Sequence, residues 1–426
     1  MVLKVDVPPT LVDGAVDDGF GPVADAFRAN FAAGAEVGAA CAVYVDGRPV
    51  VDLWGGYRDG VAKLPWRQDT MVTMFSTTKG VSSVALAHAH ARGLLDYDAT
   101  VASYWPEFGS AGKGGITVRQ LLSHQAGLAV TDMPMDLDVL ADPDRVAAAI
   151  DGQSPAWPAG TRHGYHGISL GWYESELLRR VDPKRRTIGR YFADEVATPL
   201  EAVFHIGLPA EVPAERVATI HGYKPAEMVL HLRELPPRFV LAFLDPRSAT
   251  AKAFGNPRLL GVLDNYNRRD VLALESPASN GTGEARAVAR IYSALACGGQ
   301  DLGIGPQTLS QLEHEATPPT MGLHDEILHV DTAFSLGYIK PFPSFRFGGS
   351  QWRAFGTPGA GGSFGFADPE HRVGFCYAMN RSGFRLWDDE RERSIRDALY
   401  RVLGGPPQRP DPPTTPAARR RRRPRR

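Results

Sequence analysis

The sequence predicts an α+β fold in which both ends of the chain build one sheet around a mostly helical middle. Strand-like runs rich in β-branched and aromatic residues occur at residues 39–45 and 50–56, and they return only after about residue 330. Helical patterns alternate with proline-rich connections between residues 130 and 270. Strands at both ends with helices between them are typical of α+β proteins.

The composition is that of an ordinary globular protein. With 426 residues, of which 43% are hydrophobic and 22% charged, the chain is long enough to bury a large core. Its cysteines, Cys41, Cys297 and Cys376, are far apart and odd in number, which favours reduced thiols over a disulfide framework or a zinc cluster. The N-terminus lacks an apolar signal segment, and no run is long enough to span a bilayer. We therefore expect a cytoplasmic protein.

The charge of the chain is unevenly distributed. The formal net charge is −1, but residues 419–426 carry seven arginines, so the remaining 418 residues sum to −8. Residues 406–426 are rich in proline and arginine and cannot bury apolar surface, so we expect a disordered tail. We favour a solvated appendage, and the alternative is a segment that attracts nucleic acid, an anionic membrane or an acidic partner.

Periodicity places the elements around the middle of the chain. Helices are expected at residues 18–34, 76–91, 284–296 and 388–403, and strands at 39–45, 50–56, 333–338, 352–356 and 372–379. A short helix is expected to begin near Ile116 and to end at Gly127. We expect one domain at residues 1–405. Its sheet subdomain is expected at about residues 15–70 and 330–403, and its helical subdomain at about residues 71–329.

A serine and a lysine stand one helical turn apart at the start of the expected helix at residues 76–91. Ser76 and Lys79 share a face because positions i and i+3 of a helix do, so their polar atoms come within hydrogen-bond reach. The Ser76 N–H also belongs to the unpaired donors of the helix N-terminus, where negative charge is stabilised. This indicates a nucleophile beside its base, and the equal alternative from context alone is a capping serine with a solvated lysine.

Two other serines have motif-like surroundings. Ser110 and Lys113 repeat the S-x-x-K spacing, but in a glycine-rich loop that cannot hold two side chains on one face. Ser363 lies in a G-x-S-x-G sequence, yet a turn and a strand follow it where a nucleophile elbow needs a helix. Ser363 stays the weaker rival nucleophile. We expect the glycines around it to let the backbone approach another group and direct N–H donors into a cleft.

Tyr165 and His124 are the other polar candidates. Tyr165 lies within residues 157–167, where prolines and glycines favour an ordered loop that can hold a phenol toward a site. Taken alone, a buried tyrosine with a satisfied hydroxyl is the favoured alternative. His124 has no aspartate at a motif-like spacing, so we interpret it as a structural histidine near the loop that frames the site.

Residues 200–275 are expected to line or cap a pocket, through Phe239, Leu241, Phe243 and Phe254. No metal or organic cofactor is expected. The twelve histidines contain no H-E-x-x-H, and the glycine-rich stretch from Gly109 to Gly115 fails the P-loop pattern.

Taken in order, these segments resemble the serine β-lactamase and penicillin-binding-protein superfamily, and within it the family VIII carboxylesterases. The resemblance covers most of residues 15–403. It rests on Ser76-Thr-Thr-Lys79, on Thr117 to Leu128, on Pro158-Ala-Gly160 ahead of Tyr165, on Phe204 to Pro209 and on Gly359 to Ser363. It implies a β-lactamase/transpeptidase-like α+β fold, with an antiparallel sheet flanked by helices and an inserted, mostly helical subdomain.

The resemblance also implies a role for each site residue. Ser76 is the nucleophile, Lys79 its partner base and Tyr165 the group that shuttles the proton. The N–H groups of Ser76 and Ala360 would form the oxyanion hole. Thr357-Pro358-Gly359 stands where the superfamily has Lys-Thr-Gly. We expect Tyr165, its pKa lowered by the Lys79 charge, to take the Ser76 proton and pass it to the leaving alkoxide.

Two departures from the superfamily pattern favour esters over β-lactams. Gly167 stands where similar β-lactamases carry asparagine, and Thr357 is uncharged where they carry lysine. The expected function is hydrolysis of small-molecule esters of small to medium acyl chains. The alternatives are a β-lactamase or D-alanyl-D-alanine peptidase, an acyltransferase to an alcohol and, least expected, a non-catalytic protein that binds through its tail. Nucleic acid is not required, and the oligomeric state stays open.

Overall fold

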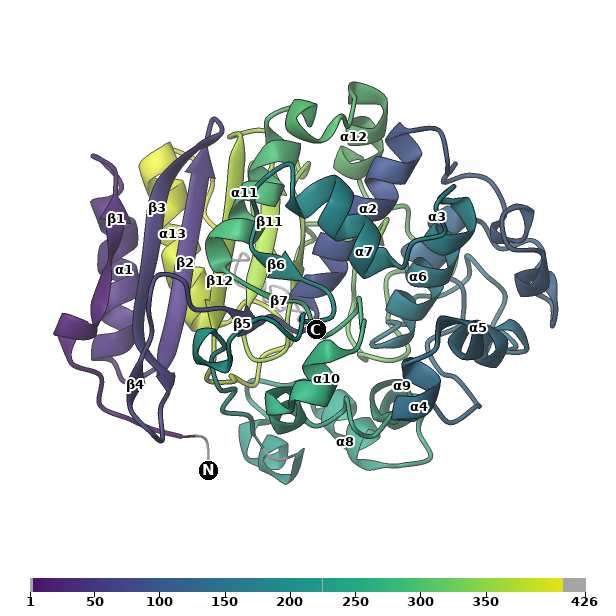
Figure 1. Ribbon diagram of the computed structural model, residues 1–426, viewed down its shortest axis with the longest axis horizontal. Coiled ribbons are helices and arrows are strands. Elements are labelled where there is room, and N and C mark those ends of the chain that lie inside the picture. Colours follow the sequence, from purple (N-terminus) through teal and green to yellow (C-terminus); the bar gives the residue numbers. More distant parts are fainter. Residues whose placement is uncertain (1–2, 224, 409–426) are drawn as a thin grey trace, which may run out of the picture.

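The structure, a computed structural model, describes residues 3–223 and 225–408 and is built on an antiparallel sheet (Figure 1). Within these residues the sheet has nine strands. In spatial order they are β1 (Val12–Val16), β3 (Arg48–Asp59), β2 (Gly38–Val45), β12 (Val373–Met379), β11 (Phe364–Asp368), β10 (Phe355–Pro358), β9 (Tyr338–Ile339) and β8 (Phe334–Ser335), with β4 (Leu64–Pro65) paired to β3. Strands β2 and β12 pair from Val45 opposite Val373 to Ala39 opposite Met379. The two ends of the chain therefore share one sheet, which confirms the predicted fold class.

Different helices cover the two faces of the sheet (Figure 1). Helices α1 (Gly21–Ala32) and α13 (Glu390–Leu403) pack together on one face, and α11 (Ala285–Ala296) packs on the other. Successive side chains of a strand point to opposite faces, so β2 contributes to both cores. On the α1 and α13 side lie Ala39, Cys41 and Val43, and on the α11 side lie Ala40 and Ala42.

The chain between the two parts of the sheet is mostly helical, as predicted. Its helices are α2 (Thr77–Ala91), α3 (Val118–Leu122), α4 (Leu137–Leu140), α5 (Pro143–Asp151), α6 (Ser169–Val181), α7 (Ile188–Phe192), α8 (Pro237–Leu244), α9 (Ala249–Gly255), α10 (Arg269–Ala273) and α12 (Pro306–Glu313). A small sheet of β5 (Val72–Thr73), β7 (Thr282–Gly283) and β6 (Phe204–His205) lies at the entry to α2. Short turns of helix are η1 (Pro9–Leu11), η2 (Val101–Ser103), η3 (Pro106–Gly109), η4 (Ala193–Ala197), η5 (Ala214–Arg216), η6 (Pro225–His231), η7 (Leu263–Asn267) and η8 (Gln300–Leu302).

Helix α2 runs through the interior of this helical part. Every residue from Thr77 to Ala89 is buried, which agrees with a sequence made largely of small and apolar residues. At Gly80 an added Cβ would lie 2.7 Å from Thr357 Oγ1, so strand β10 packs directly on the helix. The predicted helix at residues 76–91 is confirmed, with Ser76 as its N-cap.

The helix expected to end at Gly127 is shorter than predicted. Helix α3 begins after Thr117, whose side chain and that of Gln120 form a capping box, and it ends at Leu122. His124 then takes a left-handed φ of 58°. An α-helix cannot continue through that conformation, so the apolar pattern up to Gly127 belongs to an ordered turn.

Two predicted strands also have different bounds. The single strand expected at residues 333–338 is a hairpin of β8 and β9, which turns at Leu336 and Gly337 with φ values of 51° and 87°. The strand expected from Trp352 begins only at Phe355, since Trp352 has a φ of 59°. Strand β1 carries no sequence signal because its central residues are exposed at the sheet edge.

The start of the expected disordered tail is packed against the body of the protein. Gln408 is buried, and its amide donates to the Gly348 carbonyl at 3.0 Å. Residues 409–426 lie outside the described residues. In the part of the chain that is described, no helix has the length and apolar character needed to cross a bilayer. The cytoplasmic location and the division into subdomains stay predictions. Helix α11 lies within residues 71–329, the range expected for the helical subdomain, but it packs on the sheet.

Candidate active site

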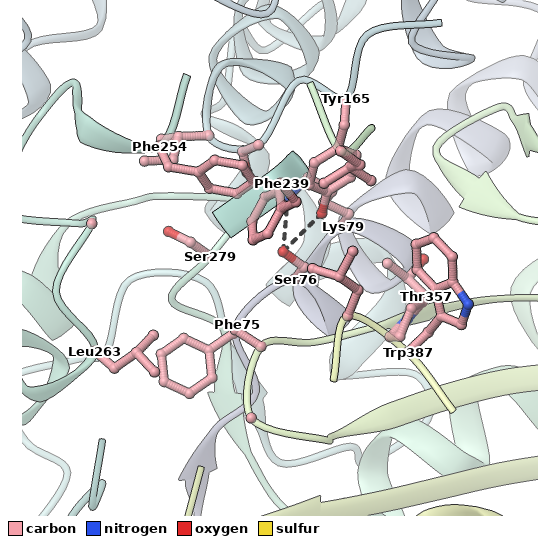
Figure 2. A pocket seen from close by; sticks show the side chains of 18 of the residues that line it. Phe75, Ser76, Lys79, Tyr165, Phe239, Phe254, Leu263, Ser279, Thr357 and Trp387 are labelled. Carbon is pink, nitrogen blue, oxygen red and sulfur yellow. Dashed lines mark hydrogen bonds between the residues drawn. The ribbon is translucent and has the colours of Figure 1, made fainter. Parts of the chain in front are cut away.

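The turn between β5 and α2 presents Ser76 to a cavity (Figure 2). Phe75 just before it has a φ of 46°, a left-handed conformation that costs about 1–3 kcal/mol for a bulky residue. The Phe75 ring packs edge-on against Tyr266, with 5.0 Å between centroids, and the Met74 N–H donates to the Gly281 carbonyl at 2.9 Å. These contacts hold the strained turn, so the Ser76 side chain has a fixed position at the helix start.

Lys79 lies one turn further along α2 and is completely buried. Its Nζ donates to Ser76 Oγ at 3.1 Å and to the carbonyls of Gly167 and Ala278 at 2.6 and 2.9 Å. Burial lowers the pKa of Lys79 to about 7, against a smaller opposite effect from the charge of Glu174. A neutral amine is therefore well populated near pH 7, and the structure brings the predicted serine and lysine together.

The Tyr165 hydroxyl donates to Ser76 Oγ at 2.9 Å, so both predicted partners meet the same oxygen (Figure 2). The rings of Phe334 and His124 flank the phenol, with centroids 5.6 and 4.9 Å away. Burial raises the pKa of Tyr165 well above its usual value, and the hydrogen bond with Ser76 opposes this only in part. The expectation of a lowered Tyr165 pKa is wrong, because removing a phenolate from water outweighs its polar contacts here.

Two buried histidines lie behind Tyr165 and hold its loop. The backbone N–H and the Nδ1 of His166 both lie 3.0 Å from His124 Nδ1, and the Leu128 N–H donates to His166 Nε2 at 3.2 Å. These bonds assign the acceptor to His124 Nδ1 and the proton to His166 Nδ1. Burial lowers the pKa of His166 to about 3 and that of His124 well below its usual value. Both rings are neutral, which agrees with a structural role for His124.

The loop between β10 and β11 is fastened to the nucleophile turn. Ser363 is buried, its Oγ donates to the Met74 carbonyl at 2.9 Å, and the same atom lies 3.0 Å from Thr77 Oγ1. An added Cβ on Gly359 would lie 2.3 Å from the Met74 oxygen, so only glycine allows this approach. Ser363 does not line the cavity, and it stands between antiparallel strands. The structure therefore separates the rival nucleophile from the site.

Two backbone N–H groups at the cavity are available to a bound oxygen. Among the described residues, no protein group accepts a hydrogen bond from the N–H of Ser76 or of Ala360. Both residues line the cavity. The backbone near Ala360 is fixed at the peptide between Gly361 and Gly362, because the Gly361 carbonyl accepts from Arg391 Nη2 at 2.6 Å and from the Gly383 N–H at 2.8 Å. Two oriented donors of this kind suit a developing oxyanion.

The second S-x-x-K sequence forms no site. Ser110 Oγ donates to the Asp151 carbonyl at 2.6 Å, and Lys113 Nζ donates to the carbonyls of Asp151 and Gln153 at 2.7 and 2.6 Å. Both side chains fasten their loop to the end of α5. Neither lines the cavity that contains Ser76.

Comparison with known proteins agrees with this geometry. A family model described as Beta-lactamase matches residues 23–400. The chain belongs to the β-lactamase family. It is an enzyme of the serine hydrolase superfamily, related to serine β-lactamases and penicillin-binding proteins.

Individual relatives of this β-lactamase-family enzyme cover nearly its whole length. The esterase/β-lactamase LipL of Mycobacterium tuberculosis is 35% identical over 379 residues, 87% of this chain and 83% of LipL. The crystal structure of a family VIII carboxylesterase has a TM-score of 0.79 and 36% identity, covering 92% of this chain and 100% of that one. A penicillin-binding protein homologue from Caulobacter crescentus has a TM-score of 0.79 and 33% identity, with the same coverage.

The cavity of this β-lactamase-family enzyme has a volume of about 160 Å³ and is largely apolar. In the view of Figure 2, Phe239 and Phe254 lie on one side of Ser76, and Thr357 and Trp387 lie on the other. Phe239, Phe243 and Phe254 line the cavity as predicted, but Leu241 is exposed to solvent. Tyr223, Met228 and Leu235 also line the cavity from within the expected range of residues 200–275. Sequence reasoning missed lining residues from later segments that share no pattern, Leu328, Phe384, Leu386 and Trp387.

The charged lining of the cavity is sparse. Lys79 and Arg385 are the charged residues that line it in the described chain, and Arg385 pairs with Glu390 at 2.9 Å. Thr357 and Pro358, from the third motif, line the cavity and bring no charge to it. Among the described residues, no group of three or more His, Cys, Asp or Glu side chains is placed to hold a metal ion.

Gly167 gives the site a feature of its own. Its carbonyl accepts from Lys79, and an added Cβ would lie 2.9 Å from the ring of Phe254. The aromatic ring therefore occupies the space next to the position where similar β-lactamases carry an asparagine side chain.

Proposed function

We propose that this enzyme is a carboxylesterase that hydrolyses esters of small to medium acyl chains through an acyl-enzyme on Ser76. One observation carries the proposal: hydrogen bonds from Lys79 Nζ at 3.1 Å and from Tyr165 at 2.9 Å converge on Ser76 Oγ beside an apolar cavity. The similarity to a family VIII carboxylesterase and to LipL, which is named as an esterase, supports the same reaction class.

Lys79 is the proposed general base. The carbonyl oxygens of Gly167 and Ala278 accept hydrogen bonds and cannot donate them. The ammonium donates to both carbonyls and to Ser76 Oγ. Once neutral, the amine keeps its two N–H groups on the carbonyls, its lone pair faces Ser76, and the Ser76 hydroxyl becomes the donor. With a pKa of about 7, roughly half of Lys79 is neutral at pH 7. Lys79 thus takes the base role that was expected of Tyr165.

In the acylation step, the Ser76 proton moves to Lys79 Nζ while Oγ forms a bond to the ester carbonyl carbon. Negative charge develops on the carbonyl oxygen, which accepts hydrogen bonds from the N–H groups of Ser76 and Ala360. The loss of one such donor costs about 2.7–4 kcal/mol in other enzymes, so the Ala360 loop is essential to this step.

Collapse of the tetrahedral intermediate breaks the bond between the carbonyl carbon and the alkoxide oxygen. Tyr165 stays protonated because its pKa is raised, and it gives its proton to the leaving alkoxide. The Lys79 ammonium, 4.8 Å from the Tyr165 ring centroid, restores that proton and returns to the amine. Water then loses a proton to Lys79 and attacks the acyl carbon. The bond between that carbon and Ser76 Oγ breaks, the Lys79 ammonium returns its proton to Ser76 Oγ, and the carboxylic acid leaves.

Two features support an ester over a β-lactam as substrate. An alkoxide leaves more easily than an amine, so the site needs to assist its departure less. Gly167 supplies no side-chain amide, and Thr357 supplies no cation for a substrate carboxylate. Because LipL is named as both an esterase and a β-lactamase, nitrocefin is the second substrate to test.

The test is rapid-mix hydrolysis of p-nitrophenyl butyrate by the wild type, Ser76→Ala and Ser363→Ala, with intact-mass detection of the acyl-enzyme. We expect a burst and an acyl adduct in the wild type and in Ser363→Ala, and neither in Ser76→Ala. Activity that survives Ser76→Ala and is lost in Ser363→Ala would move the nucleophile to the β10–β11 loop. A wild type that is inert to esters but cleaves nitrocefin would make the enzyme a β-lactamase.

A further inference from the structure

Residues 227–244, which we call the cap, carry apolar side chains on two opposite sides. The cap comprises the end of η6, the following turn and α8. Its inner side chains, Met228, Leu235, Phe239 and Phe243, line the cavity above Ser76. Its outer side chains, Val229, Leu230, Leu232, Leu241 and Leu244, are exposed. A surface helix of a globular protein normally has a polar outer face, so the cap departs from the usual pattern.

The outer apolar residues form a concentration that the rest of the described chain lacks. Among the described residues, nine large hydrophobic side chains are exposed, and five of them belong to the cap. On α8, Arg238, Leu241 and Leu244 are spaced three apart and share the outer face. Phe239 and Phe243 are spaced four apart and face inward. Concentrated apolar surface of this kind marks an interaction site, whereas single exposed residues do not.

The surroundings of the cap are positively charged, unlike the body of the protein. Within the cap two arginines balance two glutamates, and residues 245–258 after it contain three basic residues and one acidic residue, a net charge of +2, whereas residues 1–418 sum to −8. Arg233, Arg238 and Arg247 are exposed beside the outer leucines. Exposed leucines flanked by arginines are the pattern by which amphipathic segments bind the interface of an anionic lipid surface.

A second copy of the chain fits this surface less well. A stable dimer buries about 800 Å² on each partner, through some 20–30 residues a side. Five aliphatic side chains fall well short of that area, and the outer face has none of the aromatic anchors that dominate protein interfaces. A lipid surface requires no shape complementarity, and insertion of a few leucines into it is favourable.

Resting on the proposed ester hydrolysis, we propose that the outer face of the cap docks on a lipid–water surface, from which the enzyme takes its ester. The cavity lies directly beneath the docked segment, because the same residues form its wall. An apolar acyl chain then passes from the lipid into the part of the cavity that Phe239 and Phe243 line, without crossing water. The substrate class is a neutral carboxylic ester that is held in a lipid aggregate.

The binding test uses co-sedimentation of the full chain with phosphatidylcholine vesicles. The cap variant is Leu230→Ser/Leu241→Ser, at positions 82% and 71% exposed. The matched control is Val61→Ser/Met321→Ser, at positions 76% and 64% exposed outside the cap. We expect the cap variant to bind at least about tenfold more weakly and the control to bind as the wild type does. Equal binding by all three proteins, or none by the wild type, overturns the proposal.

The charge of the cap is tested with vesicles that contain phosphatidylglycerol. Arg238→Gln/Arg247→Gln should weaken binding to these vesicles by about fivefold per arginine, and leave binding to pure phosphatidylcholine unchanged. Every variant retains the C-terminal arginines, so differences between variants report on the cap. Equal binding of this variant and the wild type to the anionic vesicles contradicts the charge argument.

The activity test compares soluble and aggregated esters of the same acid. With tributyrin, we expect the wild-type rate to rise sharply once droplets form, and the cap variant to lose this rise while it cleaves soluble p-nitrophenyl butyrate normally. A wild type that cleaves the soluble ester with no rise on droplets overturns the docking proposal and leaves the esterase proposal standing. A wild type inert to both, with no acyl adduct, overturns both.

Sedimentation velocity tests whether a second copy of the chain, and not a lipid surface, binds the outer face of the cap. A dimer that the cap substitutions convert to a monomer, with vesicle binding unchanged, would assign the outer face to self-association and contradict the proposal.

Discussion

The chain contains two serine–lysine pairs of identical spacing, and only one of them forms a site. Lys79 and Lys113 are both fully buried, and each donates to two backbone carbonyls. The two lysines differ in the third group that the side-chain nitrogen contacts. Lys79 meets Ser76 Oγ at 3.1 Å, whereas Lys113 lies 5.3 Å from the centroid of the Phe108 ring. Burial with two carbonyl partners is therefore common to both, and a hydroxyl at the third position is the difference.

The electrostatic environments of the two lysines are similar in kind. Burial lowers the pKa of Lys79 to about 7, and the nearest opposing charge is that of Glu174. Burial also lowers the pKa of Lys113, and the charge of Asp151 opposes it. Each lysine nitrogen also lies near an aromatic ring, Tyr165 at 4.8 Å for Lys79 and Phe108 at 5.3 Å for Lys113. An S-x-x-K spacing therefore forms a catalytic pair only where the buried amine also contacts the serine hydroxyl, as Lys79 does at 3.1 Å.

The largest expected effect comes from removing each lysine in turn. Lys79→Met should lower kcat/KM for p-nitrophenyl butyrate by about 10³–10⁴-fold, because the general base is lost. Lys113→Met should change kcat/KM by less than about twofold but lower the free energy of unfolding by about 1–3 kcal/mol, since two carbonyls lose their donor. Steady-state kinetics and urea unfolding measure the two quantities. Equal losses of activity in both variants would remove the distinction between the pairs.

Tyr165→Phe tests the second partner of Ser76, which the Ser110 pair lacks. The substitution removes the hydroxyl and keeps the ring between Phe334 and His124. We expect kcat to fall by about 10²–10³-fold, because the leaving alkoxide loses its proton donor. Stopped-flow kinetics with esters of increasingly acidic alcohols measures this fall in kcat as a function of the leaving group. The defect should shrink as the leaving group improves, and a constant defect would assign Tyr165 a role in positioning instead.

Ser363→Ala tests how the oxyanion loop is held against the nucleophile turn. The variant loses the bond from Ser363 Oγ to the Met74 carbonyl and the contact with Thr77. We expect kcat to fall by about tenfold and the free energy of unfolding to fall by about 1 kcal/mol. Intact mass should still show the acyl adduct, and peptide mapping should locate it on Ser76. A lost adduct would return Ser363 to the position of nucleophile.

Local patterns account for the parts of the molecule that the sequence predicts correctly. The helix at residues 76–91 is recognised by a period of 3.6 residues, and the strands at 39–45 and 372–379 by short runs of apolar residues, which are local features of the sequence. The approach of Ser76 and Lys79 follows from the same local geometry. These features need no knowledge of how distant segments pack.

Contacts between distant segments account for what the sequence does not predict. The carbonyl partners of Lys79 come from Gly167 and Ala278, 88 and 199 residues away. The raised pKa of Tyr165 depends on its enclosure by several elements. Leu241 illustrates a third cause, because α8 is apolar on almost every side and its periodicity cannot select the inward face.

The smallest expected effect concerns Glu174, the carboxylate that acts on Lys79 as Asp151 acts on Lys113. Glu174 is buried, accepts from Ser82 and Ser83 at 3.1 and 2.8 Å, and its charge raises the pKa of Lys79. Glu174→Gln should therefore lower that pKa. Since the neutral amine is the active form, kcat/KM falls as pH decreases through about 7 in the wild type. In a plot of kcat/KM against pH, the fall on the acid side (the acid limb) should therefore lie at lower pH in the variant.

The change in rate at pH 7 should be small, because burial already lowers the pKa of Lys79 to about 7 in the wild type. Burial also raises the pKa of Glu174 to about 7, so Glu174 is charged, and raises the pKa of Lys79, mainly above that pH. The control is Glu176→Gln on the same helix, whose carboxylate pairs with Arg179 and Arg180. A pH profile of kcat/KM should move for Glu174→Gln alone. A limb that moves to higher pH, or that moves equally in both variants, would mean that Lys79 is not the titrating base.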